Sequence, residues 1–429
     1  MSELWVHMNG RKVGVLDGSD QRSLRFTYDD AYITDPRSTP LSVSMPLRPG
    51  PYLHSTIEPY LWGLLPDNPG VIERWGREFQ CSPRSVIALL SNVGIDVAGA
   101  AQYVPAGETP EASQPGIVEP LSHSDVGDLL RTVRQDSASW HARSQTGRWS
   151  LAGAQAKIAL AHDPVTGEWG APSGRAPTTH ILKPAIAQLD DHDLNEHLCL
   201  ATAHELGLRS AETSVAHFGE ERALVVARYD RVAAPDGSII RVHQEDFCQA
   251  LSVHPDLKYE NDGGPTTEQM VALLDDAISD DSRSQKVRLC EALAYSWLVL
   301  GPDAHAKNCS LLLSGGQVRF APLYDVASVL PYDAYPPKVR LAQKIGGEYR
   351  AGFVAARHWE RLAKAAAIPY EYLAGRIETM AENLPDAFST AIEGTDLTKA
   401  ERARAAGILD SVAAWSGSRL VPLRAEHER

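Results

Sequence analysis

Three side chains suited to metal and proton chemistry stand close together in the sequence: Asp303, Asn308 and Asp325. Asp303 and Asn308 belong to one segment, Gly-Pro-Asp-Ala-His-Ala-Lys-Asn, which spans residues 301–308. Residues 309–320 then read as an apolar run, a Gly-Gly turn and an alternating run, which predicts a β-hairpin. We expect the returning strand of this hairpin to deliver Asp325 beside the other two residues.

The spacing of these residues is that of a protein kinase. In kinases a loop aspartate meets the substrate hydroxyl, an asparagine five residues later holds Mg²⁺, and an aspartate beyond the next hairpin also holds Mg²⁺. From this segment alone a second interpretation stays open. It is a polar turn with a capping aspartate and a buried His305.

Length and composition limit the class of protein. A chain of 429 residues with 43% hydrophobic and 22% charged residues is typical of a globular protein with two or three domains. The net charge of -14 argues against the chain itself being a primary DNA or membrane binder, although a local basic patch is compatible with it. No apolar run reaches the length of a membrane span, and no signal peptide is visible. The five cysteines lack disulfide or metal spacing, so we expect reduced thiols and a cytoplasmic location.

Residues 150–157 read Ser-Leu-Ala-Gly-Ala-Gln-Ala-Lys. The small residues at 152–154 would let backbone N–H groups approach phosphate oxygens. The segment matches neither of the common glycine-rich phosphate motifs, so a tight turn between two strands is the alternative.

Two strands and one helix complete the set of candidate elements. Residues 178–183 predict a strand that ends in Lys183, which either reaches the α- and β-phosphates of ATP or is an ordinary lysine at a strand end. A helix from about residue 195 to 206 carries Glu196 in its first turn, where the helix dipole alone favours an acidic residue. In a kinase this glutamate would pair with the strand lysine. Residues 223–231 predict a buried strand. In a kinase the end of this strand would supply backbone groups to adenine, and the alternative is an ordinary strand end without a ligand.

The first half of the chain reads as mixed α/β and the second half as mainly helical. This pattern predicts a two-lobed α/β (α+β) fold with the chemistry where the lobes join. We expect a β-rich N-terminal region at 1–104, a linker or surface loop at 105–120, and a lobe with the phosphate loop at 121–230. Residues 231–429 are expected to form the mainly helical lobe with the catalytic and metal-binding loops.

The order of these blocks closely resembles that of the HipA family of serine/threonine-kinase toxins. The resemblance covers nearly the whole chain and includes residues 45–47 and 64–68 of the N-terminal region. The matching blocks lie at residues 150–157, 178–183, 195–196, 228–231, 244–249, 258–260, 303–308 and 323–325.

The resemblance implies a protein-kinase-like fold with an all-helical C-terminal lobe, ATP and Mg²⁺ as cofactors, and phosphorylation of Ser or Thr on a protein. It implies the toxin of a type II toxin-antitoxin system whose target is a translation component such as an aminoacyl-tRNA synthetase, with growth arrest or persistence as the result. It also implies a helix-turn-helix antitoxin dimer (HipB-like) as partner. Operator DNA would be bound mainly through that antitoxin, with transcription repression as a second role. Arg361 and Lys364 fall where the family has a basic spot facing DNA, and a solvated helix face explains them equally well.

The family also implies roles for individual residues. Asp303 would accept the proton of the substrate hydroxyl, Asn308 and Asp325 would bind Mg²⁺, and Lys183 would be held by Glu196. Ser150 matches the family's autophosphorylation site, and phosphoserine there would repel the triphosphate. The positions implied to contact ATP are Ala152, Gly153, Ala154, Gln155, Ala156, Lys157, Lys183, Ala227, Arg228, Tyr229, His305, Lys307, Asn308, Tyr324 and Asp325.

Two residues depart from the family pattern. Ala304 replaces the glycine that usually follows the catalytic aspartate, and Ala227 stands where a well-known member has a glutamate. Neither change removes a charged or amide group that the chemistry needs. Two other functions remain open: a catalytically weak co-repressor that bridges antitoxin on DNA, and a kinase that acts on small molecules or lipids.

Overall fold

The computed structural model describes residues 3–18, 23–113, 116–140, 149–186, 189–277, 281–332 and 338–424. The chain divides into two compact units. The first unit comprises Met1–Ala187, Ala216–Asp256 and Leu311–Val318. The second comprises Gln188–Val215, Leu257–Ser310 and Arg319–Arg429. Both units are therefore assembled from segments that are distant in the sequence.

The first unit begins with a five-stranded sheet in the order β4-β3-β2-β1-β5. Its central hairpin is the one that Asn9-Gly10 predicts, and both residues have the positive φ of a type I′ turn, 45° and 78°. The sheet buries alternate side chains such as Leu4, Leu16 and Phe26. Its strands are β1 (Glu3–Met8), β2 (Arg11–Asp17), β3 (Arg25–Tyr28), β4 (Tyr52–Leu53) and β5 (Ala101–Pro105).

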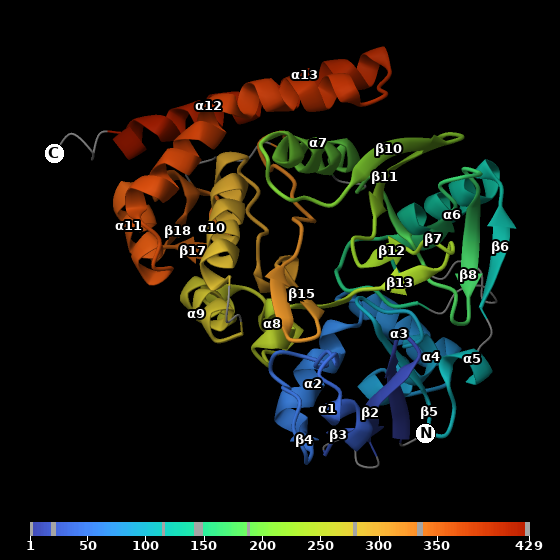
Figure 1. The fold of residues 1–429 in the computed structure, drawn as a ribbon. Coiled ribbons are helices and arrows are strands. Elements are labelled where there is room, and N and C mark those ends of the chain that lie inside the picture. The colour runs from blue at the N-terminus through green and yellow to red at the C-terminus, as the bar shows by residue number, and fades with distance from the viewer. Residues whose placement is uncertain are drawn as a thin grey trace. The chain divides into compact units, whose positions relative to one another are not determined.

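Four helices accompany this sheet and share its hydrophobic core (Figure 1). Asn68 caps α3 and Ser85 caps α4 through side-chain oxygens, as expected for these residue types. The helices are α1 (Asp30–Thr34), α2 (His54–Gly63), α3 (Pro69–Glu78) and α4 (Val86–Val93). The core includes large side chains that are almost fully buried, among them Tyr60 and Trp75.

The first unit continues with a six-stranded sheet in the order β10-β11-β9-β7-β8-β6. Helix α6 (His123–Gln135) starts at the predicted cap, where Ser122 and Asp125 form a reciprocal capping box. It packs Val126, Leu130 and Val133 against this sheet. The strands are β6 (Ile117–Leu121), β7 (Ile158–His162), β8 (Trp169–Ser173), β9 (His180–Pro184), β10 (Thr213–Phe218) and β11 (Glu221–Ala227).

Smaller elements follow the six-stranded sheet. Asp246 and Gln249 form a capping box at α8 (Phe247–Ala250). A two-stranded sheet pairs β12 (Arg231–Ala233) with β13 (Ile239–Arg241). The predicted hairpin of residues 309–320 is present as β15 (Ser310–Ser314) and β16 (Gln317–Phe320), and β15 pairs with β14 (His243–Asp246).

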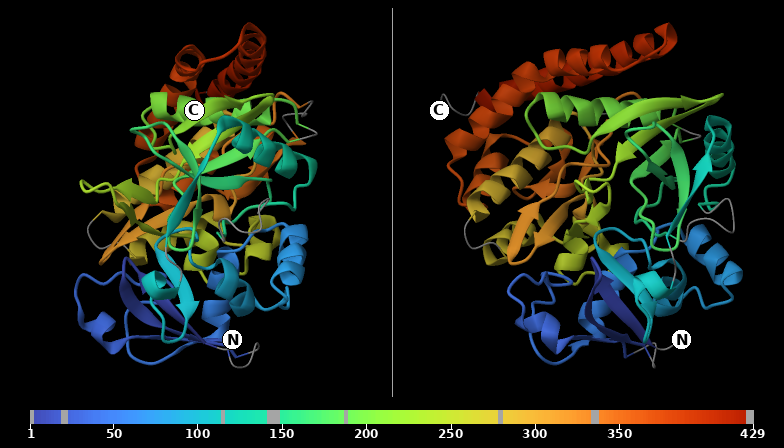
Figure 2. Two further views of the ribbon diagram at one scale, coloured as in Figure 1. Left: turned by 90° about the vertical axis from the view of Figure 1, so that its right-hand side faces the viewer. Right: turned by 45° about the vertical axis from the view of Figure 1, so that its right-hand side comes forward.

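The second unit is mainly helical and is organised around α10 (Ser282–Leu298). The last turns of this helix are buried, and Trp297 donates its indole N–H to Ala351 O at 2.9 Å while its carbonyl accepts from Trp415 Nε1 at 2.9 Å. The two longest helices, α12 and α13, lie side by side (Figure 2). The other helices are α7 (His192–Glu205), α9 (Thr267–Ala277), α11 (Ala356–Ala365), α12 (Tyr370–Gly394) and α13 (Lys399–Arg424).

The structure contains elements that the sequence did not predict. Segment 105–120, predicted to be a linker or surface loop, contains α5 (Pro110–Ser113) and most of the edge strand β6. Only one side of an edge strand is paired, so Pro120 is tolerated there. Helix α3 and the hairpin of β17 (Arg340–Ile345) and β18 (Glu348–Arg350) were also not predicted. Helix α7 begins at His192, which moves Glu196 beyond the predicted first turn.

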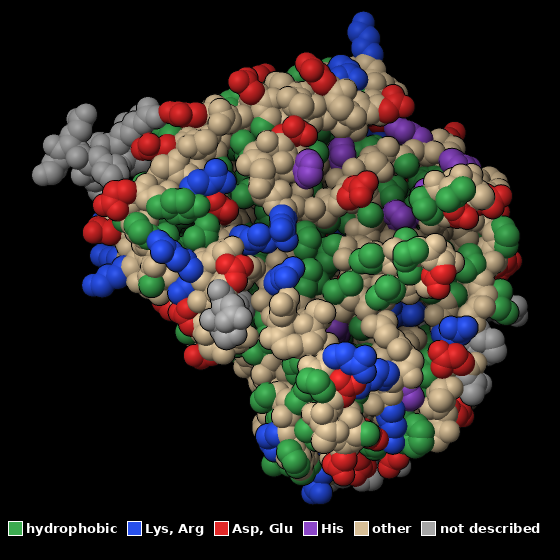
Figure 3. All heavy atoms as spheres, in the orientation of Figure 1, with side chains coloured by type: hydrophobic (Ala, Val, Ile, Leu, Met, Phe, Trp, Pro, Cys, Tyr) green, Lys and Arg blue, Asp and Glu red, His purple; other side chains and the backbone are tan. Residues whose placement is uncertain are grey.

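The next features are the distribution of side chains on the surface, the state of the cysteines and the hydrophobicity of the helices. On the face drawn in Figure 3, acidic, basic and apolar side chains are interspersed. All five cysteines are free thiols, and four of them are buried. Across the described ranges, no helix combines the length and hydrophobicity that crossing a membrane requires.

Candidate active site

The chain turns sharply between α10 and Asp303. Leu300 has a left-handed backbone with φ of 51°, and the N–H groups of Leu300 and Gly301 bond back to carbonyls of the last helical turn. A Cβ atom at Gly301 would lie only 3.1 Å from Ala327 O. The backbone of the loop therefore runs closely beside the segment that follows Asp325.

His305 organises the loop that carries Asp303. Its Nδ1 accepts a hydrogen bond from the N–H of Asn308 at 3.2 Å and caps the single 3-10 turn at Ala306–Asn308. Because Nδ1 is an acceptor, the proton of the neutral ring lies on Nε2, which is 3.9 Å from Asp303 Oδ2. The side chain of His305 is 4% exposed and that of Asp303 is 60% exposed. The histidine is thus a buried support, while the aspartate faces solvent.

The amide of Asn308 is oriented by Asp303. Asn308 Nδ2 donates to the backbone carbonyl of Asp303 at 2.9 Å. This bond uses the nitrogen end of the amide and leaves Oδ1 on the opposite side. An amide oxygen and a carboxylate are the kind of hard oxygen ligands that Mg²⁺ takes.

Asp325 is held against the same loop by its neighbours. The hydroxyl of Tyr324 donates to Lys307 O at 2.6 Å, and Val329 N donates to Leu300 O at 3.1 Å. Asp325 itself has φ of 53°, a conformation that costs a non-glycine residue on the order of 1–3 kcal/mol and that clusters at functional sites. Within the second unit, the structure thus brings the segments of the three predicted residues together. Their catalytic and metal-binding roles stay predictions.

The predicted phosphate loop lies in the first unit and is fastened at its base. Ser150 is fully buried, its Oγ donates to Leu64 O at 2.8 Å, and its N–H donates to Asp96 O at 2.9 Å. Further along the loop, Asp67 N donates to Gly153 O at 3.0 Å. Residues 64–67 therefore hold the loop at two points.

The phosphate loop closes on itself through Lys157. Its Nζ donates to Ala152 O at 2.7 Å and lies 5.2 Å from the centre of the Trp140 ring. Gly153 has φ of +105°, and a Cβ there would lie 2.6 Å from Lys157 Nζ. Gln155 Nε2 is buried and, among the described residues, has no hydrogen-bond partner. An unpaired amide donor and a glycine turn beside a lysine are features that fit phosphate oxygens.

The predicted lysine strand and adenine strand are neighbours in the six-stranded sheet. Lys183 on β9 pairs in register with Leu224 on β11. At the end of β11, Arg228 N donates to Thr179 O at 2.9 Å, so this N–H is already used. The Tyr229 hydroxyl bonds to Gln244 Oε1. The predicted backbone contact of residues 227–229 with adenine is not tested by these bonds.

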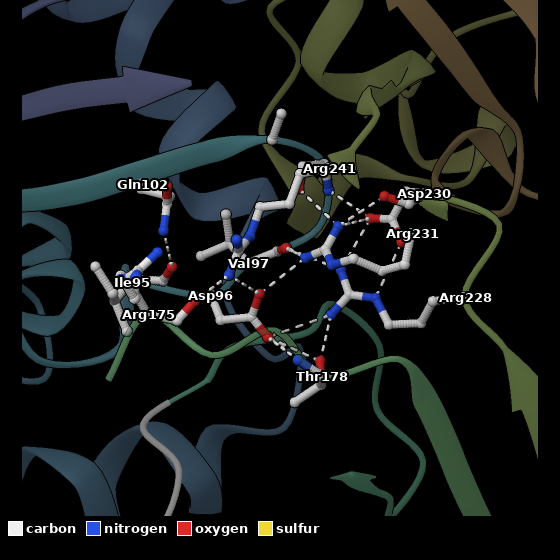
Figure 4. A network of polar contacts seen from close by, with 12 residues as sticks. Ile95, Asp96, Val97, Gln102, Arg175, Thr178, Arg228, Asp230, Arg231 and Arg241 are labelled. Carbon is white, nitrogen blue, oxygen red and sulfur yellow. Dashed lines mark hydrogen bonds and ion pairs between the residues drawn. The ribbon is translucent and has the colours of Figure 1, made fainter. Parts of the chain in front are cut away.

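A buried network of charges meets the base of the phosphate loop at Asp96, whose carbonyl accepts the bond from Ser150 N. Figure 4 shows this network. Arg231 Nη2 donates to Asp96 Oδ1 at 2.9 Å, and Arg228 Nη2 donates to Asp230 Oδ2 at 2.8 Å. Arg241 Nη2 adds a contact of 3.3 Å to Asp96. Thr178, just before β9, donates its N–H and its hydroxyl to Asp96. The network therefore joins the ends of β9 and β11 to the residue that bonds Ser150.

The charges in this network are strongly coupled. Burial opposes ionisation of Asp96, but the guanidinium groups of Arg231, Arg228 and Arg241 outweigh it and lower its pKa to about 2. Burial together with repulsion from Arg228 lowers the pKa of Arg231 to about 10. Asp96 and Arg231 therefore remain charged at neutral pH. The network as a whole sets three arginines against two aspartates.

The remaining predicted residues lie on known elements. Lys183 is buried in the first unit and Glu196 is buried on α7 in the second, so their pairing stays a prediction. The side chain of Lys307 is buried. Arg361 and Lys364 are exposed on α11, and their role toward DNA is likewise untested.

Sequence reasoning missed two sets of residues at these sites. Tyr259 donates its hydroxyl to Asp303 Oδ1 at 2.8 Å, and residues 64–67 fasten the phosphate loop. Both belong to blocks already singled out by their resemblance to a family, residues 258–260 and 64–68. That resemblance was the only signal, because each contact spans more than forty residues of sequence.

Two family models match the chain. The HipA-like C-terminal domain matches residues 149–388, and the HipA N-terminal domain matches residues 4–104. The first match contains all three residues of the Asp303 site and the phosphate loop. The second contains the residues that fasten that loop.

Individual relatives match over most of the chain. Y4mE of Sinorhizobium fredii is 33% identical over 409 residues, which cover 95% of this chain and 96% of that protein. The serine/threonine-protein kinase toxin HipA of Shewanella oneidensis is 28% identical over 370 residues, covering 82% and 81% of the two chains.

A solved structure of Shewanella oneidensis HipA with HipB and its operator DNA superimposes with a TM-score of 0.83, 24% identity and 97% coverage of both chains. This likeness confirms the predicted fold class, a two-lobed kinase-like fold with a mixed α/β part and a mainly helical part. The mainly helical second unit also contains the two-stranded sheet of β17 and β18, so it is not helical throughout.

Proposed function

From the premise that this chain belongs to the HipA family, we propose that it is an ATP- and Mg²⁺-dependent kinase that phosphorylates Ser or Thr on a protein. The observation that carries the proposal is the arrangement around Asp303. Its exposed carboxylate, the oriented amide of Asn308 and the anchored Asp325 segment share one loop system.

Each residue has a defined part in the proposed reaction. Asp303 orients the acceptor hydroxyl and takes its proton, while Asn308 Oδ1 and the Asp325 carboxylate hold Mg²⁺. When bound, Mg²⁺ offsets the negative charge of the phosphates. Residues 152–157 bind the triphosphate through backbone and side-chain N–H groups, and Lys183 neutralises the α- and β-phosphates. Phosphoryl transfer depends mainly on such positioning and electrostatics.

We extend the proposal to the biological role. The name of the Shewanella oneidensis relative describes a kinase toxin, and the related structure contains an antitoxin and operator DNA. By analogy, this chain acts as the toxin of a type II system, with a HipB-like helix-turn-helix antitoxin as partner and repression of its own operon as a second role. Its target is a translation component, an aminoacyl-tRNA synthetase by the same analogy.

The burial of Ser150 supports its predicted role in self-inactivation. A phosphate adds about -1.5 to -2 charges. Phosphorylation also removes the proton that Ser150 Oγ donates to Leu64 O. A phosphoserine is thus incompatible with the seated phosphate loop, and we propose that it abolishes ATP binding.

Intact-mass spectrometry of dephosphorylated protein incubated with Mg-ATP tests the activity. Wild type should gain one phosphate at Ser150, and Asp303→Ala should be slower by about 10²- to 10⁴-fold. Asp256→Ala, which removes an exposed carboxylate of the first unit, serves as control. If neither folded protein transfers phosphate to itself or to proteins of a heat-treated bacterial lysate, the co-repressor function becomes the better explanation. Phosphate transfer from γ-labelled ATP only to small molecules or lipids of the lysate would instead indicate a small-molecule or lipid kinase.

A further inference from the structure

Tyr259 is placed rigidly beside Asp303 by the turn in which it lies. Its carbonyl accepts hydrogen bonds from Asp262 N and Gly264 N, each at 3.0 Å. The next residue, Glu260, is buried and accepts from Lys344 N at 2.7 Å, with Lys344 Nζ 3.4 Å away. The turn is therefore held both by hydrogen bonds within its backbone and by the contacts of the Glu260 side chain with Lys344.

The same turn contacts the catalytic loop at three points. Ala306 N donates to Lys258 O at 3.3 Å. The rings of Tyr259 and His305 meet edge to face with centroids 5.0 Å apart, a favoured aromatic geometry. The hydroxyl of Tyr259 then donates to Asp303 Oδ1 at 2.8 Å. A residue 44 positions earlier in the chain thus reaches the proposed proton acceptor directly.

The two oxygens of Asp303 have different surroundings. Oδ1 accepts from Tyr259, whereas Oδ2 lies 3.9 Å from His305 Nε2, beyond hydrogen-bond distance. The side chain is 60% exposed, so packing alone does not fix its rotation. The hydroxyl of Tyr259 is the contact that selects one orientation of the carboxylate.

We propose that Tyr259 is a positioning residue that engages Oδ1 and thereby presents Oδ2 to the acceptor hydroxyl. This inference rests on the proposed kinase function. In the transfer step the acceptor oxygen forms a bond to the γ-phosphorus, the bond from that phosphorus to the β,γ-bridging oxygen breaks, and ADP leaves. The acceptor proton passes to Asp303 Oδ2. Tyr259 forms and breaks no covalent bond, and it touches neither ATP nor the acceptor in this assignment.

The test compares full-length wild type with Tyr259→Phe, which removes only the hydroxyl, and with Tyr372→Phe as control. Tyr372 is 50% exposed on α12 in the same unit. Initial rates of phosphate transfer from γ-labelled ATP to proteins of a heat-treated bacterial lysate are measured over a range of ATP concentrations. Binding of Mg-ATP by calorimetry and the thermal unfolding midpoint are measured on the same samples.

A misplaced catalytic group costs up to about 10²-fold in rate. We expect Tyr259→Phe to lower kcat by about 10- to 100-fold, with KM for ATP, the Kd of Mg-ATP and the unfolding midpoint close to wild type. Tyr372→Phe should match wild type in every measurement.

Two results would overturn the assignment while leaving the kinase function intact. One is a Tyr259→Phe protein as active as wild type. The other is a loss of rate that is matched by weaker Mg-ATP binding or a lower unfolding midpoint, which would indicate a merely structural role. A wild-type protein that transfers no phosphate to any acceptor would instead reject the kinase function and this assignment with it.

Discussion

Glu245 is a carboxyl group that the fold buries almost completely. Its Oε2 lies 2.6 Å from Ser42 Oγ, and its Oε1 accepts from Val43 N at 2.7 Å. Burial raises the pKa of Glu245 to about 8, although these two hydrogen bonds oppose the shift. In the unfolded chain the same group titrates near 4.5. The folded protein therefore binds one more proton than the unfolded chain between these two values.

This difference makes stability fall as pH rises. The contribution of Glu245 is complete below its unfolded pKa and is lost as pH rises toward 8, by up to about 1.4 kcal/mol per pH unit. Glu245→Gln keeps an acceptor and a donor but does not titrate. We expect its unfolding midpoint, relative to wild type, to increase between pH 5 and pH 8.5 in thermal scans.

Glu268→Gln, at an exposed position on α9, provides the control for this experiment. Its midpoint relative to wild type should stay constant over the same pH range. A flat difference for Glu245→Gln as well would mean that Glu245 is ionised in the folded protein at neutral pH.

At the scale of residues, the sequence predicted the members of the candidate site that are close in the chain. Asp303 and Asn308 are five positions apart, and a readable hairpin links them to Asp325. Tyr259 was not predicted, because its contact with Asp303 depends on how a separate turn packs. The buried partners of Ser150 were missed for the same reason.

The phosphate loop is the element whose shape depends most on one glycine. Gly153→Ala places a methyl group 2.6 Å from Lys157 Nζ and strains a backbone with φ of +105°. Lys157 must then leave Ala152 O, and the loop changes shape. We expect Mg-ATP binding, measured by calorimetry, to weaken by about 10- to 100-fold, equivalent to one charge-assisted hydrogen bond.

Gly167→Ala is the control that separates the backbone strain of an alanine at positive φ from the displacement of Lys157 in the phosphate loop. Gly167 has φ of +74° in the β7–β8 turn, with no atom within 4 Å of an added Cβ. Both substitutions should lower the unfolding midpoint, but only Gly153→Ala should weaken nucleotide binding. Equal binding by the two variants would argue against the loop as the phosphate site.

Elements with strong local signals were predicted well. Three such signals are the Asn-Gly pair at 9–10 for a tight turn, Ser122 ahead of an amphipathic run for a helix cap, and the Thr-x-x-Gln spacing at 266–269 for a capping box. All three features are present in the structure. These features depend on a few neighbouring residues. Strand β6 is exposed along most of its length and pairs with β8, which lies far along the chain, so its sequence carried little signal. Strand β18 has only three residues, and its pairing with β17 is irregular in register, so this hairpin also lacks a regular alternation.

At the scale of the whole chain, the order of segments conceals the division into units. Residues 216–256 and 311–318 return to the first unit after the chain has already built part of the second. Composition and periodicity describe neighbouring residues and therefore cannot reveal such returns. The buried charge network shows how the first unit unites its segments, because Asp96 lies in one family match and its arginine partners lie in the other.

We expect Asp96→Asn to destabilise this unit strongly. The substitution keeps the size of the side chain but leaves three buried arginines against one aspartate. Breaking a buried ion pair in this way costs about 3–5 kcal/mol. In urea unfolding, Asp96→Asn should show its midpoint at a lower urea concentration than wild type. The control Asp236→Asn, in an exposed turn, should leave the urea midpoint unchanged. A wild-type urea midpoint for Asp96→Asn would mean that water or movement compensates the missing charge.

The same network limits how the sequence can drift over evolutionary time. A neutral residue at either aspartate position leaves three arginines against one aspartate, so a lineage that loses one of these carboxylates gains fitness by replacing an arginine soon afterwards. Alignments of relatives should therefore show positions 96, 228, 230, 231 and 241 either kept together or replaced together. Recombination between distant relatives at a boundary near residue 110 would take Asp96 from one parent and its arginine partners from the other. Such chimaeras should fold only when both parents carry the same residues at these five positions.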